Sequence, residues 1–306
     1  MEAIFIKRVY ALTAQILGNE IDLNVALESL NGYLEHAKRL KMQRYEAETL
    51  NTLGILYGII GNIPKQMYYF KSAYEYTELY DDDDHDFVMK TTNNLGVGYY
   101  SSWQLEEAKN IFERGITIID QYDIHTLVAI YIYSNMIELY MIDGDFEKAD
   151  TCFERAWLIA QQVKMKDYSR MEFFIIVTSL HHQKAQIDIA LGNCEAVNER
   201  LALASEQIEK TSHKILHQAN DLIRMYHALI CEKDEIKAKT YEDDLLAQLG
   251  GSFSTDKALE TSIFLKHNHQ PEWAKRYVSM VLDTPNDDDD PILTTMKRYA
   301  IDILKG

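Results

Sequence analysis

The hydrophobic positions of this chain repeat along its length in a pattern typical of paired helices. The segment 51–57, Asn-Thr-Leu-Gly-Ile-Leu-Tyr, recurs at 93–99 as Asn-Asn-Leu-Gly-Val-Gly-Tyr, and Phe112 follows Phe70 by the same 42 residues. A third copy places Phe153 41 residues after Phe112. Repeats of this length are typical of helical arrays in which each unit buries its apolar face against its neighbours.

Each copy has the same predicted layout. A first helix presents a small residue to its partner, a turn follows, and an aromatic residue and an alanine on a second helix pack back on the first. The turns are Gly-Asn-Ile-Pro at 61–64 and Asp-Gly-Asp at 143–145, which supply backbone freedom or a helix N-cap. The middle copy has Trp103 and Gln104 at this point, which is a weaker turn signal.

Fainter copies extend the array in both directions. The helices predicted there are 1–17 with 23–40, 171–191 with 194–208, 215–231 with 235–249, 255–266 with 272–282, and a closing helix at 291–304. The sequence therefore predicts an all-α protein, a single α-solenoid over residues 1–306. It has about seven antiparallel helix pairs and a C-terminal capping helix, and the repeats are clearest over 45–160.

The best repeats carry a recognisable family pattern. Their shared positions are Leu53-Gly54, Tyr57, Phe70 and Ala73 in one copy and Leu95-Gly96, Tyr99, Ala108 and Phe112 in the next. These residues resemble the tetratricopeptide repeat (TPR) family, although the period near 42 exceeds the usual 34. The resemblance implies a right-handed superhelix whose first helices line a concave groove.

The long repeats look more like those of bacterial sensors and regulators. Such proteins include peptide-pheromone receptors, maltose-regulator-type activators and repeat domains fused to diguanylate cyclases. The helix-turn-helix of those receptors and the GGDEF signature of the cyclases are absent from this sequence. The array also has asparagine where chaperone-binding relatives need lysine in their carboxylate clamp, which argues against capture of a C-terminal carboxylate.

Composition and charge limit the kinds of partner that this chain is expected to bind. The formal net charge of −17 disfavours direct binding to nucleic acid and favours a basic or neutral partner. Lys7 and Arg8 interrupt the N-terminal apolar stretch, and no later run is long enough to span a membrane. The three cysteines, at 152, 194 and 231, are odd in number and far apart, so we predict neither a disulfide framework nor a zinc cluster. These features predict a reduced, cytoplasmic protein that does not bind membranes.

No sequence motif points to catalysis or to a cofactor. Walker loops, dinucleotide fingerprints, nucleophile elbows and zinc-protease helices are absent, so we predict no enzyme activity, no metal site and no cofactor. The acidic runs 81–86 and 287–290 read as solvated loops. The histidine pairs at 181–182 and 267–269 read as packing residues, because adjacent helical side chains point about 100° apart. Cys152 reads as a small core residue.

Polar residues recur on the predicted first helices. Asparagine is a poor helix-interior residue, so its repetition there calls for a reason. An amide can both donate to and accept from a peptide backbone, so a ladder of asparagines could hold an extended peptide. The alternative is that these amides bond only to neighbouring helices. The predicted groove residues are Asn51, Asn93, Asn94, Asn135, Glu138, His182 and Gln186, with Tyr100 and Tyr131 as aromatic walls and Arg224 continuing the polar line.

The sequence thus favours a non-catalytic peptide- or protein-binding module, the sensory or adaptor part of a bacterial signalling or transcription-regulatory system. One alternative is a regulatory domain that controls an attached or partner catalytic domain, such as a diguanylate cyclase or a response regulator. Another is a structural scaffold that holds two proteins together. A homodimer is also left open.

Overall fold

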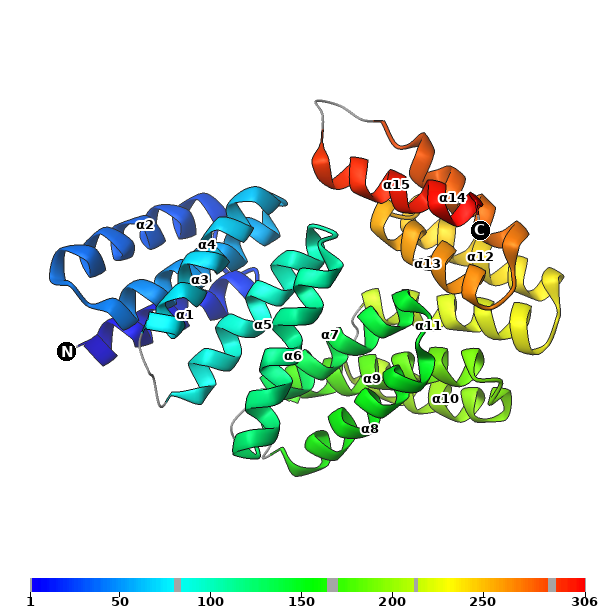
Figure 1. The fold of residues 1–306 in the computed structure, drawn as a ribbon, viewed down its shortest axis with the longest axis horizontal. Helices are drawn as coiled ribbons and strands as arrows, with labels where there is room; N and C mark the ends of the chain where they lie inside the picture. The colour runs from blue at the N-terminus through cyan, green and yellow to red at the C-terminus, as the bar shows by residue number, and fades with distance from the viewer. Residues whose placement is uncertain (1, 80–83, 164–169, 212–213, 286–289, 306) are drawn as a thin grey trace. The chain divides into compact units, whose positions relative to one another are not determined.

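The computed structural model describes residues 2–79, 84–163, 170–211, 214–285 and 290–305 (Figure 1). By contacts the chain divides into two compact units, Met1–Ile124 and His125–Gly306. The helices of the first unit are α1 (Glu2–Leu17), α2 (Leu23–Leu40), α3 (Gln43–Ile59), α4 (Ile63–Leu79), α5 (His85–Ser101) and α6 (Leu105–Tyr122). Those of the second are α7 (Leu127–Asp143), α8 (Phe146–Gln162), α9 (Arg170–Ala190), α10 (Cys194–Thr211), α11 (Lys214–Tyr226), the π-helical η2 (His227–Cys231), α12 (Glu235–Leu249), α13 (Thr255–His267), α14 (Pro271–Asp283) and α15 (Pro291–Lys305).

The predicted all-α fold is confirmed: helices of each predicted pair pack on each other, and the described residues contain no strand. The boundaries agree to within a few residues, including the closing helix, now α15. One predicted helix, 215–231, ends in a π-helical turn that its pattern did not show. None of the helices in the described ranges is long and apolar enough to cross a membrane. The continuity of one solenoid across both units stays a prediction.

The repeated glycines mark the closest approach of the paired helices in the first unit. A Cβ placed on Gly54 would stand 2.3 Å from the Phe70 ring, and one on Gly96 would stand 2.4 Å from the Phe112 ring. Both rings are buried. The glycine and the phenylalanine of each copy therefore form one packing unit, and this contact explains why they recur at the same spacing.

The turn with the stronger sequence signal has a side-chain cap in the structure, and the weaker turn does not. Gly61 takes a φ of 79°, and the Asn62 side chain accepts a hydrogen bond from the Lys65 backbone N–H at the start of α4. The weaker middle turn has Trp103 at a φ of 54° with no side-chain cap at Gln104. Burial of the Trp103 indole stabilises that turn instead.

The acidic runs lie partly outside the described residues, which omit 80–83 and 286–289. Asp84 and Asp290 are described, and each caps a helix. The Asp84 carboxylate accepts from the Phe87 backbone N–H at the start of α5. The Asp290 carboxylate accepts from the Ile292 N–H at the start of α15. Both positions suit an aspartate, because the first N–H groups of a helix lack intrahelical partners.

In the second unit the array folds back so that α13 touches α7. The His267 ring lies against Gly144 and donates from Nε2 to the Ile142 carbonyl oxygen at 3.0 Å. The rings of Phe146 and Phe264 meet edge to face beside it. The fourth helix pair of this unit therefore packs on the first, a contact between residues more than a hundred positions apart.

The expectation of a reduced chain without a disulfide framework was wrong, because Cys194 and Cys231 form a disulfide. The packing of α10 beside η2 brings their Cα atoms to 5.7 Å, within the range that a disulfide requires. Spacing along the chain could not show this, because the two residues lie 37 positions apart at the ends of different helices. Cys152 is a free, buried thiol, and burial raises its pKa to about 11.

Candidate functional site

The predicted asparagines of the first unit meet between α3 and α5. The Asn94 amide nitrogen donates to the Asn51 carbonyl oxygen at 2.9 Å, and the Asn93 amide nitrogen donates to the Asn94 oxygen at 3.3 Å. Asn51 is buried, whereas Asn93 and Asn94 are half-buried. The three amides thus form one chain of hydrogen bonds between two first helices, and its outer members remain partly exposed.

A charged cluster that sequence reasoning missed lies on the same helices. The Glu48 carboxylate is buried and accepts hydrogen bonds from the Tyr10 hydroxyl of α1, the Arg44 guanidinium and the Lys90 ammonium of α5. Burial and Glu48 together raise the pKa of Tyr10. A sequence signal existed, because Glu48 and Lys90 are 42 residues apart and so occupy the same repeat position with opposite charges.

In the second unit the polar line runs from α7 to α9. Gln183, which the sequence did not single out, donates to the Ser134 carbonyl oxygen at 3.1 Å and to the Glu138 carboxylate at 3.3 Å. The Ser134 hydroxyl donates back to the Gln183 carbonyl oxygen at 3.1 Å. Glu138 also helps to raise the pKa of Lys257 on α13, after the larger effect of Glu260.

The two adjacent histidines of α9 face different neighbours. His181 packs against the Trp157 ring, and His182 lies beside Asn220 of α11. Both are buried, and burial lowers the pKa of each to about 4, aided by Arg200 at His181 and by His181 at His182. They are neutral near pH 7, which fits a packing role better than acid–base chemistry at that pH.

The remaining predicted residues are half-buried. These are Tyr100 on α5, Tyr131 and Asn135 on α7, and Gln186 on α9. Burial, with a smaller effect of Glu172, raises the pKa of Tyr131. The structure therefore brings together the predicted asparagines of the first unit, whereas in the second unit Glu138 bonds Gln183, which was not predicted. A single groove that joins the two groups stays a prediction.

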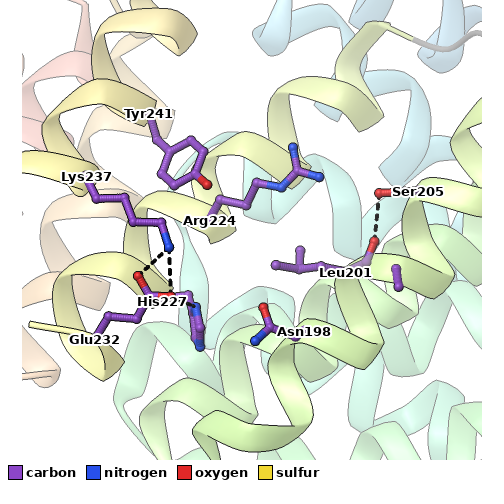
Figure 2. Close-up of a pocket in the computed structure, with 9 residues that line it drawn as sticks. Asn198, Leu201, Ser205, Arg224, His227, Glu232, Lys237 and Tyr241 are labelled. Carbon is purple, nitrogen blue, oxygen red and sulfur yellow. Dashed lines mark hydrogen bonds and ion pairs between the residues drawn. The ribbon is translucent and has the colours of Figure 1, made fainter. Parts of the chain in front are cut away.

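Arg224 lines a polar pocket of about 220 Å³ between α10, α11 with η2, and α12. Figure 2 shows its side chain beside Tyr241, with Asn198 and His227 on the opposite side and the Lys237–Glu232 pair on a third. Lys237 bonds both oxygens of Glu232, at 2.7 and 2.9 Å. The pocket residues are Asn198, Leu201, Ala202, Ser205, Arg224, His227, Glu232, Lys237 and Tyr241.

The polar groups described above are suited to binding a partner. Among the described side chains, no group of three or more His, Cys, Asp or Glu residues is placed to hold a metal ion. The polar groups on the first helices are amides, a carboxylate and basic side chains, which bind partners by hydrogen bonds and charge.

The sequence matches no protein-family model and, at a significant level, no curated protein. The structure is similar to the crystal structure of BtubC (BKLC) from P. vanneervenii, with a TM-score of 0.58 and 14% identity over 76% of this chain and 94% of that one. It also resembles a tetratricopeptide repeat protein from Parabacteroides merdae, with a TM-score of 0.46 and 11% identity over 97% of this chain and 99% of that one. At such identities a likeness concerns the fold alone. The paired helices and the repeated Gly–Phe contacts give this chain a TPR-like helical-repeat fold.

Proposed function

We propose that this chain is a non-catalytic binding module that holds a peptide or protein segment against the first helices of its pairs. The observation that carries the proposal is the chain of amides between α3 and α5, in which Asn51 is buried and Asn94 and Asn93 are half-buried. A side-chain amide offers both N–H donors and an acceptor oxygen, the two kinds of group that pair with the C=O and N–H of a peptide unit. Such groups can pair with a peptide backbone whatever its side chains.

In this proposal the asparagines have different roles. Asn51 is 2% exposed, so it orients Asn94 through their hydrogen bond rather than reaching the partner. Asn93 and Asn94 contact the peptide. On the same helices, Lys90 and Arg44 pair with the buried Glu48 carboxylate. Arg44 also pairs with Asp84, so the charges of this cluster balance. In the second unit, Asn135, Glu138 and Gln186 form a contact of their own in this proposal. Tyr100 of the first unit and Tyr131 of the second are the aromatic walls.

The proposed biological role is that of a sensor or adaptor in a bacterial signalling or transcription-regulatory pathway, in the cytoplasm. We propose this role because the repeats are long and TPR-like. The net charge of −17 favours a partner segment that is basic or neutral.

A selection from a random peptide library on the purified chain tests the proposal. We expect Asn93→Ala and Asn94→Ala each to weaken a selected peptide by about 0.5 to 3 kcal/mol, because a buried peptide group would lose its partner. Asn110→Ala is the matched control, since Asn110 is exposed on the second helix α6. Equal affinity of the peptide for the two groove variants and the control would refute the proposed site.

A further inference from the structure

The polar pocket of the second unit lies on residues other than those proposed to hold a peptide. Its walls come from three helical segments: α10 carries Asn198 and Ser205, α11 with η2 carries Arg224 and His227, and α12 carries Lys237 and Tyr241. Figure 2 shows these side chains around an open centre. A volume of about 220 Å³ suits a ligand smaller than a typical drug, whose pockets start near 300 Å³.

Both cations of this site are paired with carboxylates, and the remaining N–H donors of Arg224 favour a ligand with an acidic group there. Lys237 is neutralised by Glu232, which its ammonium contacts through both carboxylate oxygens. Arg224 donates from Nη1 to Asp221 at 3.2 Å, and Asp221 is itself held by Gln248. A guanidinium has five N–H donors, so this bond leaves donors for a second acceptor.

A carboxylate fits the pocket better than a phosphate. The planar guanidinium matches a carboxylate in a bidentate pair, and a monoanion is repelled less than a dianion by Glu232 in the lining and by Asp221 beside Arg224. The Tyr241 hydroxyl can donate to the same group. Glu232 and Asn198 can accept from a hydroxyl or amino group elsewhere on the molecule. A small hydroxy acid or amino acid carries the groups that match these donors and acceptors.

The disulfide fastens two walls of this pocket. Cys194 lies one helical turn before Asn198 on α10, and Cys231 lies directly before Glu232 at the end of η2. Between His227 and Cys231 the backbone is π-helical, a conformation that is rare in proteins and frequent at functional sites. The covalent link therefore holds the π-helical wall, with His227 and Glu232, at a set position relative to α10.

We propose that this pocket binds a small hydroxy or amino acid through Arg224, and that the redox state of Cys194 and Cys231 sets its affinity. Reduction by a dithiol breaks the S–S bond: the dithiol gives two electrons and two protons, becomes a disulfide, and leaves Cys194 and Cys231 as thiols. The wall formed by η2 is then free to move relative to α10. Oxidation of the two thiols by a disulfide of another molecule reverses the step.

Calorimetric titration of the oxidised chain tests the ligand class. The probes are D-gluconate, its uncharged alcohol D-glucitol, L-glutamine and inorganic phosphate. We expect at least one of the two carboxylates to bind more tightly than D-glucitol and phosphate by about tenfold or more, and Arg224→Gln to remove that preference. Arg298→Gln, at an exposed arginine of α15, should leave it unchanged. Absence of saturable carboxylate binding below about 10 mM, or tighter binding of phosphate, would overturn the proposed ligand class.

A second titration, with the tighter carboxylate, tests the redox part. We expect reduced chain and the Cys231→Ser variant to bind at least about fivefold more weakly than oxidised chain. Cys152→Ala, which removes the free thiol, should keep the full redox response. Helical circular dichroism of each sample shows that the chain is folded. Equal affinity in oxidised and reduced folded chain would sink the redox control while leaving the binding result intact.

Discussion

Gly96 and Phe112 touch so closely that the ring occupies the place of a Cβ: the Cε1 atom would lie 2.4 Å from it. Because Phe112 is fully buried, it has no free space to move into. We therefore expect Gly96→Ala, and Gly54→Ala by the same contact with Phe70, to destabilise the chain by about 1 to 3 kcal/mol, and Leu at least as much.

Gly32 is the matched control for these variants. It lies in α2, and a Cβ there would meet no atom within 4 Å. Alanine at this position should stabilise by about 0.5 to 1 kcal/mol, since it is the better helix former. Urea unfolding of the three alanine variants measures the difference. Equal free energies of unfolding would show that the glycines do not mark the helix contact.

The contact between α7 and α13 can be measured through another pair of glycines. Gly144 and Gly192 both have a positive φ, of 78° and 79°, so alanine strains the backbone similarly at each. Only Gly144 also lies against a side chain, with a Cβ 2.7 Å from the His267 ring. Gly144→Ala should therefore cost about 1 kcal/mol or more beyond Gly192→Ala, and an equal loss at both would contradict the contact.

The buried histidines predict a loss of stability in mild acid. Their pKa is lowered from 6.5 to about 4 in the folded chain, so between these values the unfolded chain binds more protons. Their contribution is complete above about pH 6.5 and is lost as the pH falls towards 4, by roughly 3 kcal/mol for each histidine. His182→Gln should flatten the dependence of the unfolding free energy on pH. His217→Gln, at an exposed site, should not flatten it.

Loss of the disulfide should destabilise the second unit. The bridge closes a loop over a sequence separation of 37 residues, for which chain entropy corresponds to about 3 to 4 kcal/mol. Denaturant unfolding with and without a reducing agent measures this effect, and the Cys194→Ser variant should match the reduced chain. If reduction leaves the unfolding midpoint of the wild type unchanged, the two cysteines are not bridged in solution.

The sequence by itself determined the helices, their pairing and the residues at which pairs touch. These features are local or periodic: turn residues end the helices, and equivalent positions such as Gly54 and Gly96 pack in the same way in successive repeats. The asparagines were also found by repetition, but their hydrogen bonds were not. The repeat pairs Asn51 with Asn93, whereas the amide that bonds Asn51 belongs to Asn94.

Only the tertiary structure decided the contacts between residues that share no repeat position. His267 meets Gly144, Cys194 meets Cys231, and Arg224 lines a pocket together with residues of α10 and α12. Each depends on how helix pairs stack and turn over many residues. Small differences in packing angle accumulate along such an array and decide which distant side chains meet. A periodic pattern in one sequence does not contain these angles.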